Sequence, residues 1–202
     1  MTRLEPRLVR AAFDSQTVTV YQAYSPEIAD AAVQAGTFVP PFSLGRMTWI
    51  KPSFGWMMHR CGWASKPGQE RVLAIQISRD GLEWALAHAC LSHYDPDVHQ
   101  SPQAWTAAKS QSPVRVQWDP DRSLTGDRLS ARAIQVGLAD EAARRYVGQW
   151  ITSVTDITGL VRRVRDLVRS DRADALALLP AERVYPLPPE LARPIGADLD
   201  PA

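Results

Sequence analysis

The chain has 202 residues, 45% of them hydrophobic and 22% charged, a composition typical of one globular domain and not of a disordered chain. Its 23 basic and 22 acidic groups leave a net charge of +1, so overall charge gives no reason to expect a nucleic acid or a membrane surface as partner. The 2 cysteines exclude a disulfide scaffold, and no apolar run reaches the roughly 20 residues of a membrane-spanning helix.

The N-terminal segment and the cysteines indicate a cytoplasmic protein. Residues 1–14 carry charges on both sides of each short apolar stretch and contain no hydrophobic signal region, so we expect no signal peptide. Cys61 and Cys90 belong to no metal-spaced cluster, and so few cysteines are typical of a reducing compartment. We therefore expect a cytoplasmic location, no membrane partner and no bound metal. The oligomeric state stays open.

The first predicted elements are a strand and a helix. Residues 17–24 alternate β-branched or aromatic side chains with others, which predicts a strand. A helix is expected between Ser25, a suitable N-cap followed by proline, and Gly36, a suitable left-handed stop. Residues 38–42 are too rich in proline for a central strand and predict an extended loop.

Three further strands are predicted in the middle of the chain. Residues 71–77, 114–118 and 131–136 are rich in β-branched side chains and end near turn signals. Residues 80–90 carry apolar side chains every fourth position and predict a helix. The polar stretch 93–112 predicts a long loop with at most one helical turn.

Two amphipathic helices are predicted near the C-terminus, because apolar residues recur there at i, i+3, i+4 and i+7 spacing. Asp140 is the expected cap of the first helix. The two apolar stripes are Ala143, Tyr146, Val147, Trp150 and Ile151, and then Ile157, Leu160, Val161, Val164, Leu167 and Val168. Prolines and acids crowd the chain beyond them, which predicts a loosely ordered tail over residues 171–202.

This order of elements favours an α+β fold. Only the first crossover has the strand–helix–strand pattern of a parallel unit, and no strand precedes a glycine-rich phosphate loop. We therefore expect a mixed, largely antiparallel sheet with helices packed on it, the two C-terminal amphipathic helices among them. The predicted single domain spans residues 10–170.

The most unusual segment covers residues 46–71. It combines three tryptophans, five cations and one acid: Trp49, Trp56, Trp63, Arg46, Lys51, Arg60, Lys66, Arg71 and Glu70. Cations interleaved with aromatic rings suit a ligand with both phosphate and a flat ring, such as a nucleotide, a dinucleotide or a single-stranded nucleic acid. In the alternative interpretation the aromatic residues are core, with a buried helix over residues 53–60.

Other candidate groups have simpler structural explanations. The 4 histidines show none of the spacings of a zinc site. Cys61 has basic neighbours that can lower a thiol pKa, but no histidine is identifiable as its activator. Arg115 and Arg132 lie on predicted strands and are alternative phosphate contacts. The arginines of the last helix form either a solvated face or a contact to RNA.

Three motifs carry a family resemblance. At VYQAYSPEIADAAVQAG, RMTWIKPSFGWMMHRCGW and KPGQERVLAIQI the chain resembles a family of bacterial and fungal proteins described as a domain of unknown function (number four-two-nine-one). The resemblance runs from about Arg10 to Arg169 and includes VQWDPDR and both C-terminal helices. It implies no established chemistry.

A second resemblance is to ADP-ribosyltransferases. In that family a first strand with a tyrosine-arginine or histidine motif leads into a helix and a glycine. A middle strand begins with a serine or tyrosine motif, and a later strand opens with the catalytic glutamate before an aliphatic run. Here VYQAY followed by PEIADAAVQAG is similar to the first element, with Gln22 at the arginine or histidine position. PGQERVLAI is similar to the last, with Gln69 and Glu70 ahead of Val72 and Leu73.

This resemblance implies an enzyme that transfers or hydrolyses ADP-ribose with NAD as its substrate. Glu70 would be the catalytic carboxylate and would stabilise the oxocarbenium-like ribose as nicotinamide leaves. Gln22 would be the catalytic-site residue of the first motif. The implied NAD-binding residues are the cations Arg46 and Lys51, the aromatic residues Tyr21 and Trp49, and the middle-motif candidates Thr48 and Ser53, with Ser65 a further candidate for that motif.

Two positions depart from the pattern of that family. Gln22 carries no charge, and alignment on the aliphatic run puts Arg71 at the position of the glutamate, one residue after Glu70. The alternative function is a non-catalytic RNA- or nucleotide-binding module that uses residues 46–71 and the last helix. A third interpretation makes the segment core, with the protein acting through partners.

Overall fold

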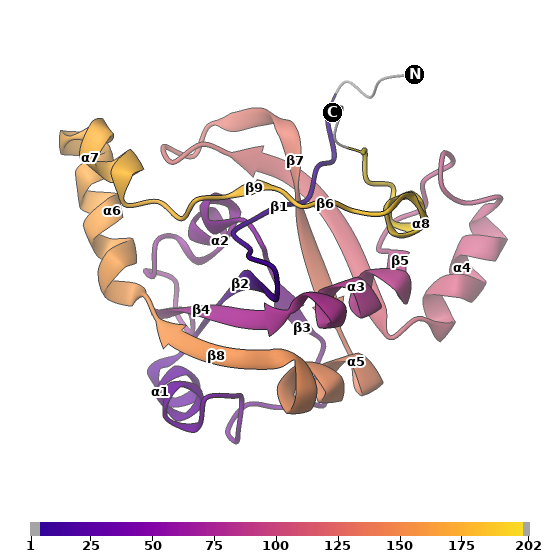
Figure 1. The fold of residues 1–202 in the computed structure, drawn as a ribbon, viewed down its shortest axis with the longest axis horizontal. Helices are drawn as coiled ribbons and strands as arrows, with labels where there is room; N and C mark the ends of the chain where they lie inside the picture. Colours follow the sequence, from indigo (N-terminus) through magenta and orange to yellow (C-terminus); the bar gives the residue numbers. More distant parts are fainter. Residues whose placement is uncertain (1–4, 200–202) are drawn as a thin grey trace.

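The computed structural model describes residues 5–199 (Figure 1). The first half of the chain forms β1 (Arg10–Ala11), β2 (Thr17–Tyr24), α1 (Pro26–Ala35), β3 (Thr48–Ile50), α2 (Phe54–Cys61), β4 (Arg71–Ser78), α3 (Arg79–Ala87), β5 (Ala89–Leu91) and α4 (Pro102–Gln111). The second half forms β6 (Val114–Arg122), β7 (Arg128–Leu138), α5 (Asp140–Arg145), the π-helical η1 (Tyr146–Trp150), β8 (Ile151–Asp156), α6 (Thr158–Ser170), α7 (Arg172–Ala177), β9 (Arg183–Val184), α8 (Pro189–Ala192) and the 3₁₀ turn η2 (Arg193–Ile195).

The strands form a three-stranded sheet ordered β2-β4-β8, a four-stranded sheet ordered β3-β7-β6-β5, and the short pair β1-β9. Every pairing is antiparallel except β5 with β6. The two larger sheets are joined at a single bridge, where the backbones of Tyr21 and Lys51 exchange hydrogen bonds of 2.8 and 3.2 Å. The predicted α+β fold with a mixed, largely antiparallel sheet is therefore confirmed.

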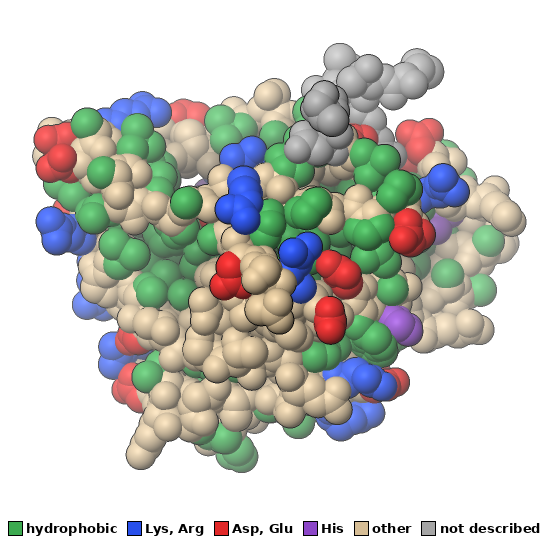
Figure 2. Space-filling model, viewed as in Figure 1, with side chains coloured by type: hydrophobic (Ala, Val, Ile, Leu, Met, Phe, Trp, Pro, Cys, Tyr) green, Lys and Arg blue, Asp and Glu red, His purple; other side chains and the backbone are tan. Residues whose placement is uncertain are grey.

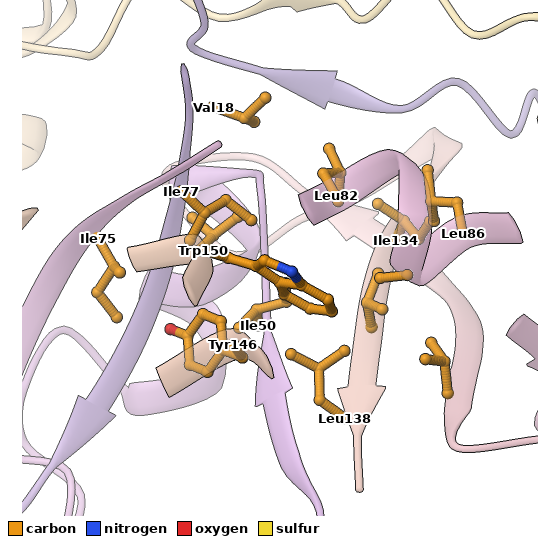
Figure 3. Close-up of a cluster of buried hydrophobic side chains, with 14 of the residues drawn as sticks. Val18, Ile50, Ile75, Ile77, Leu82, Leu86, Ile134, Leu138, Tyr146 and Trp150 are labelled. Carbon is orange, nitrogen blue, oxygen red and sulfur yellow. The ribbon is translucent and has the colours of Figure 1, made fainter. Parts of the chain in front are cut away.

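The main core lies between the two larger sheets (Figure 3). At its centre Tyr146 and Trp150 project from η1 toward side chains of β4, α3 and β7. Trp150 packs so closely on Gly81 that a Cβ at Gly81 would lie 2.4 Å from its Cγ, so this position of α3 has no room for a side chain. The surrounding buried residues include Val18, Ile50, Ile75, Ile77, Leu82, Leu86, Ile134 and Leu138.

A smaller core covers the other face of β2 and β4. Tyr21 lies there against Phe54 of α2, with the ring centroids 5.7 Å apart. Val72 of β4 and Val161 of α6 complete this cluster. Since side chains alternate along a strand, Gln22 and Leu73 lie on the face opposite Tyr21 and Val72. The small core thus fixes α2 beside β2, and α2 supplies part of the site described below.

Helix α4 and the parallel pair differ from the sequence prediction. Residues 93–112, expected to form a loop, contain a ten-residue helix that Ser101 caps by accepting a hydrogen bond from the Ala104 amide at 3.1 Å. None of its residues is buried, so it lacks the apolar stripe on which such a prediction depends. This helix connects the parallel pair β5 and β6, whereas β2 and β4, the expected parallel unit, pair antiparallel.

Three element boundaries also differ. The helix predicted to reach residue 90 ends at Ala87, and Cys90 belongs to β5. Strand β6 continues through Pro120, where its register with β7 shifts. The first amphipathic helix has Ala139 as its N-cap instead of Asp140, changes at Tyr146 into the π-helical turn, and is followed directly by β8 at Ile151.

Residues 171–199 are also more ordered than their composition predicts, and the last three residues of the predicted tail lie outside the described residues. The described segment contains α7, β9, α8 and η2, and β9 pairs with β1 across the face of the molecule (Figure 1). Tyr185 and Ile195 are buried in the main core. The prolines separate short elements, each anchored by an apolar side chain, so the segment wraps the domain in a defined path. Among the described residues, no helix combines the length and apolar character needed to cross a membrane.

Candidate functional site

A cavity of about 540 Å³, called the main cavity below, lies between the end of β2 and the segment that contains β3, next to the bridge from Tyr21 to Lys51. Residues 22–25 at the end of β2 form one wall, and residues 46–49 with Lys51 form the opposite wall. Phe42 and the neighbouring loop, Arg60 of α2, and residues 68–69 complete it. Its volume is within the roughly 300–1,000 Å³ typical of small-molecule sites.

The main cavity is lined by cations and aromatic rings. Arg46, Lys51 and Arg60 line it, and no aspartate or glutamate does so among the described residues. Tyr24, Phe42 and Trp49 supply ring faces or edges. Cations without a competing carboxylate attract anions, and the rings offer stacking surfaces for a flat group. Arg46 and Lys51, predicted as phosphate-binding residues, therefore meet in one concave site.

Gln22 is the centre of a buried hydrogen-bond network beside this cavity. Its Nε2 donates to Thr48 Oγ1 at 2.6 Å and to Tyr24 Oη at 2.9 Å. Its Oε1 accepts a hydrogen bond from Tyr146 Oη at 2.7 Å. Gln22 is 2% exposed, and a neutral amide at this depth needs no counter-ion, which explains why glutamine is stable here. Both ends of its amide are engaged, so Gln22 positions Thr48 and Tyr24.

Burial perturbs the titration of two cavity residues. The pKa of Lys51 is lowered to about 7 by burial first, and then by the positive charge of Arg60. Its Nζ donates to the Trp49 carbonyl at 2.9 Å. Burial raises the pKa of Tyr24 to about 12, so its hydroxyl stays protonated at neutral pH. The site therefore combines a neutral phenol with a lysine that loses its proton near pH 7.

The ring of Trp49 is held against a glycine of the neighbouring strand. Trp49 pairs with Gly137 across β3 and β7. A Cβ at Gly137 would lie 3.0 Å from the Trp49 ring and 2.6 Å from Met47 Sδ. Glycine is thus needed for Met47 and Trp49 to lie flat on β7 and line the cavity.

The remaining residues predicted for the site lie around the cavity and do not line it. Tyr21 faces the small core, and burial raises its pKa. Ser53 caps α2 by accepting from the Trp56 amide at 3.4 Å. Glu70 lies directly after the cavity-lining residues 68–69. Its Oε1 accepts from the Gly68 amide at 2.8 Å, and its Oε2 is buried without a hydrogen-bond partner among the described residues.

A second cavity of about 450 Å³, called the side cavity below, adjoins the main one. Trp49, Lys51 and Arg60 line both cavities. The floor of the side cavity is the outer face of the four-stranded sheet, where Gln117 of β6 pairs with Gln135 of β7. Trp56 and His59 of α2 form its wall. The two cavities therefore meet at three shared side chains.

A carboxylate distinguishes the side cavity. Asp119 accepts hydrogen bonds from Gln117 Nε2 at 2.8 Å and from Gln135 Nε2 at 2.6 Å. Because both amides donate to Asp119, their carbonyl oxygens stay available as acceptors. The pKa of His59 is lowered by burial first and then by the charges of Arg122, Lys66 and Arg60, so this imidazole is neutral at pH 7.

The other predicted alternatives are engaged elsewhere. Arg115 donates to carbonyl groups at the end of α4, including Ser112 O at 2.7 Å, and Arg132 donates to Glu5 at 2.7 Å. Cys61 is buried, and burial raises its thiol pKa. Within residues 5–199, His, Cys, Asp and Glu side chains form no group of three or more that could hold a metal ion. Basic and acidic side chains are interspersed on the face drawn in Figure 2, with no continuous basic strip.

Sequence reasoning missed the residues that only the pairing of strands brings to the site. Gln117, Asp119 and Gln135 lie far from the aromatic-basic segment along the chain. The signal was present in VRVQWD, where polar residues alternate with Val116 and Trp118, which are buried. A strand with one polar face implies that this face meets solvent or a cavity.

The fold and the site define the class of protein: an α+β domain with one cavity lined by basic and aromatic side chains and an adjoining polar cavity. The profile of a family described as "Domain of unknown function (DUF4291)" matches residues 8–185. The chain belongs to this family, which confirms the first resemblance seen in the sequence. No curated protein matches the chain. The similarity to ADP-ribosyltransferases stays a prediction.

Proposed function

We propose that the main cavity binds a nucleotide of the NAD class. The observation that carries this proposal is the composition of its lining: two arginines, a lysine and three aromatic residues, with no carboxylate among the described lining residues. Arg46 and Arg60 would hold the phosphates, since guanidinium groups match phosphate oxygens in pairs. Trp49, held flat against Gly137, would stack on a ring of the ligand.

Ligand-dependent thermal unfolding tests this proposal directly. A ligand at about a hundred times its dissociation constant stabilises by about 2.7 kcal/mol, which for a chain of this size raises the Tm by roughly 5–10 °C. We expect such a rise with millimolar NAD, and a smaller one with AMP. The variant Arg46→Ala/Arg60→Ala should lose most of the rise, whereas Arg162→Ala/Arg163→Ala on α6 should keep it.

Two results would contradict nucleotide binding in this cavity. One is a rise of the same size in wild type and in the Arg46/Arg60 variant. The other is a rise with a short single-stranded RNA but none with NAD or AMP, which would favour the non-catalytic RNA-binding module. Both arginines are exposed, so their replacement should leave the fold intact.

A second proposed function is glycosyl transfer or hydrolysis on the bound NAD, with Glu70 as the catalytic carboxylate. The observation that favours it is Glu70 Oε2, which is buried without a partner beside the cavity-lining residues 68–69. Buried polar atoms are paired in most proteins, and exceptions gather at functional sites. A carboxylate there would stabilise the positive charge that develops on ribose as nicotinamide leaves.

Nicotinamide release measured in wild type and in Glu70→Gln tests the second function. We expect the variant to lower kcat by about a hundredfold or more while it keeps the NAD-induced rise in Tm, because the carboxylate acts on the transition state. Glu190→Gln on α8, an exposed glutamate, is the control. An unchanged rate in Glu70→Gln would remove this residue from the mechanism and leave the binding proposal standing.

A further inference from the structure

Lys51 lies at the junction between the two cavities. Its side chain lines both, although the residue is only 7% exposed. Its Nζ has one hydrogen-bond partner among the described residues, the Trp49 carbonyl, and no carboxylate within salt-bridge distance. An amine with one partner keeps further positions free for a ligand.

The charged groups around Lys51 come from three elements. Arg60 of α2 disfavours its ammonium form and Asp119 of β6 favours it, whereas Cys61 of α2 favours it only as a thiolate, whose formation burial disfavours. Arg46, from the loop before β3, lines the main cavity with it. Burial and the Arg60 charge outweigh Asp119, so a large share of Lys51 is a neutral amine at pH 7.

The two cavities offer opposite hydrogen-bonding chemistry. The main cavity presents cations and suits an anionic ligand. The side cavity presents the Asp119 carboxylate and the carbonyl oxygens of two glutamines, which accept hydrogen bonds. Arg60 on its rim disfavours a cationic ligand, so a neutral molecule with several hydroxyl groups matches this lining better than an amine does.

We propose that the side cavity seats the acceptor of the transfer reaction, a neutral molecule with a hydroxyl group, and that Lys51 removes the proton of this hydroxyl. The inference rests on the proposed function, because it requires NAD in the main cavity. Of the three side chains that line both cavities, Lys51 carries the amine, which lies where donor and acceptor would meet.

The step balances without any further reactant. The acceptor oxygen forms a bond to C1 of the ribose, and the bond from C1 to the nicotinamide nitrogen breaks. The electron pair of that bond leaves with nicotinamide, whose ring nitrogen becomes neutral. The hydroxyl proton passes to the neutral amine of Lys51, which becomes an ammonium and later releases the proton to water.

Chemical labelling of lysines in the wild-type chain tests whether the Lys51 amine is reactive at neutral pH, and it requires no variant. Lys51, Lys66 and Lys109 are the only lysines in the sequence, so mass spectrometry resolves each site. Reductive methylation with formaldehyde at pH 6–9 should modify Lys51 at pH 7 at least about tenfold faster than the other two, since formaldehyde reacts with the neutral amine and burial lowers the pKa of Lys51. NAD should slow the labelling of Lys51 and leave Lys66 unchanged.

The acceptor subsite is tested by the fate of ADP-ribose. With NAD and D-ribose as the acceptor probe, we expect both free ADP-ribose and a ribosylated product in wild type. Asp119→Asn should lower the ribosylated share of the ADP-ribose formed about fivefold or more, whereas Asp174→Asn on α7, an exposed site, should leave that share unchanged. Lys51→Met should abolish the rise in transfer that wild type shows between pH 6 and 8.

The outcomes separate this inference from the proposed function. Normal NAD binding and nicotinamide release with a Lys51 that labels no faster than Lys66 would overturn the inference alone. An unchanged ribosylated fraction in Asp119→Asn would also overturn it alone. Absence of any nucleotide binding would overturn the proposed function and this inference together.

Discussion

Two segments of the chain are rich in basic residues, and they differ in where the fold places these side chains: around one cavity in the first segment, and exposed to solvent in the second. In residues 46–60 Arg46, Lys51 and Arg60 meet at one cavity with aromatic rings. In α6 the arginines are exposed on the side away from Val161 and Val164, which are buried. A helix with one apolar stripe exposes its charged side chains to solvent, whereas a strand and a neighbouring helix can direct charged side chains into a common cavity.

The two segments differ because only the first is held by neighbouring elements that direct its basic side chains toward one cavity. Around the main cavity the bridge between Tyr21 and Lys51 holds β3 beside β2, and α2 is fixed by the small core. Helix α6 has only its inner face fixed. The comparison can be tested by perturbing the scaffold of the first segment and the charges of the second.

The largest effect is expected for Gln22→Leu. This change leaves the buried Tyr146 hydroxyl without its acceptor and removes a donor to Thr48 and Tyr24. Since a buried group without a partner is costly, we expect the free energy of unfolding to fall by about 2–4 kcal/mol. Urea unfolding measures it. Gln34→Leu, an exposed site on α1, is the control and should change stability by less than about 0.5 kcal/mol.

If Gln22→Leu were as stable as the control, the network would not be the scaffold that holds β2 and β3 together. The loss should also weaken NAD binding, because Thr48 and Tyr24 both line the main cavity. A stable variant with unchanged binding would contradict both expectations.

The pH dependence of stability tests the burial of Lys51. Its pKa is about 7 in the folded protein and has its ordinary value of 10.5 in the unfolded chain. Between these values the unfolded state binds more protons, so stability contributed by this group rises with pH. We expect a gain of about 1–3 kcal/mol between pH 7 and 9.5 that is absent in Lys51→Met.

Glu182 contributes the opposite slope at lower pH and is the internal comparison. Burial raises its pKa to about 7 from 4.5, although its Oε1 accepts a hydrogen bond from the Phe54 amide. The folded state therefore binds more protons between pH 4.5 and 7, and stability should fall as pH rises through this window. Glu182→Gln should flatten that slope and leave the Lys51 slope above pH 7 unchanged. Equal slopes in all three proteins would contradict both assignments.

Much of the fold could be predicted from residues close together in the sequence. Strands β2 and β4 follow from alternating β-branched side chains, and α6 from its periodic stripe. Arg46, Trp49 and Lys51 are predicted as site residues because cations and rings are adjacent in the chain, and Thr48 only through the resemblance to ADP-ribosyltransferases. Local sequence patterns of this kind determine local structure, so the strands, the helix and the aromatic-basic segment can be predicted from them.

What could not be predicted depends on contacts between distant residues. The bridge from Tyr21 to Lys51 determines that Lys51 is buried, and Asp119 reaches the side cavity only through the pairing of β6 with β7. Tyr185 packs in the main core although its neighbours in the sequence resemble a loose tail. Composition indicates neither pairing nor docking, because both depend on surfaces that form only in the folded state.

Two glycine substitutions, one in each segment's surroundings, should change the free energy of unfolding in opposite directions. Gly137→Ala forces Met47 and Trp49 from β7, and we expect a loss of about 1–2 kcal/mol and weaker NAD binding. Gly159→Ala in α6 meets no atom within 4 Å, so it should stabilise the helix by up to about 1 kcal/mol. Thermal unfolding with and without NAD measures both. A neutral Gly137→Ala would mean that the Trp49 ring is free to move.

The smallest effect is expected for the charges of α6. Arg162→Ala and Arg163→Ala remove exposed cations, and each should change the free energy of unfolding by less than about 0.5 kcal/mol. Affinity for a short RNA, measured across a salt titration, should be weak and unchanged in the double variant. If the arginines bound RNA phosphates, each lost contact would reduce the salt dependence of binding by about one unit of slope. A reduced salt dependence in the double variant would show that exposed arginines on a helix bind RNA without a cavity that gathers them. Helix α6 would then be a second binding surface.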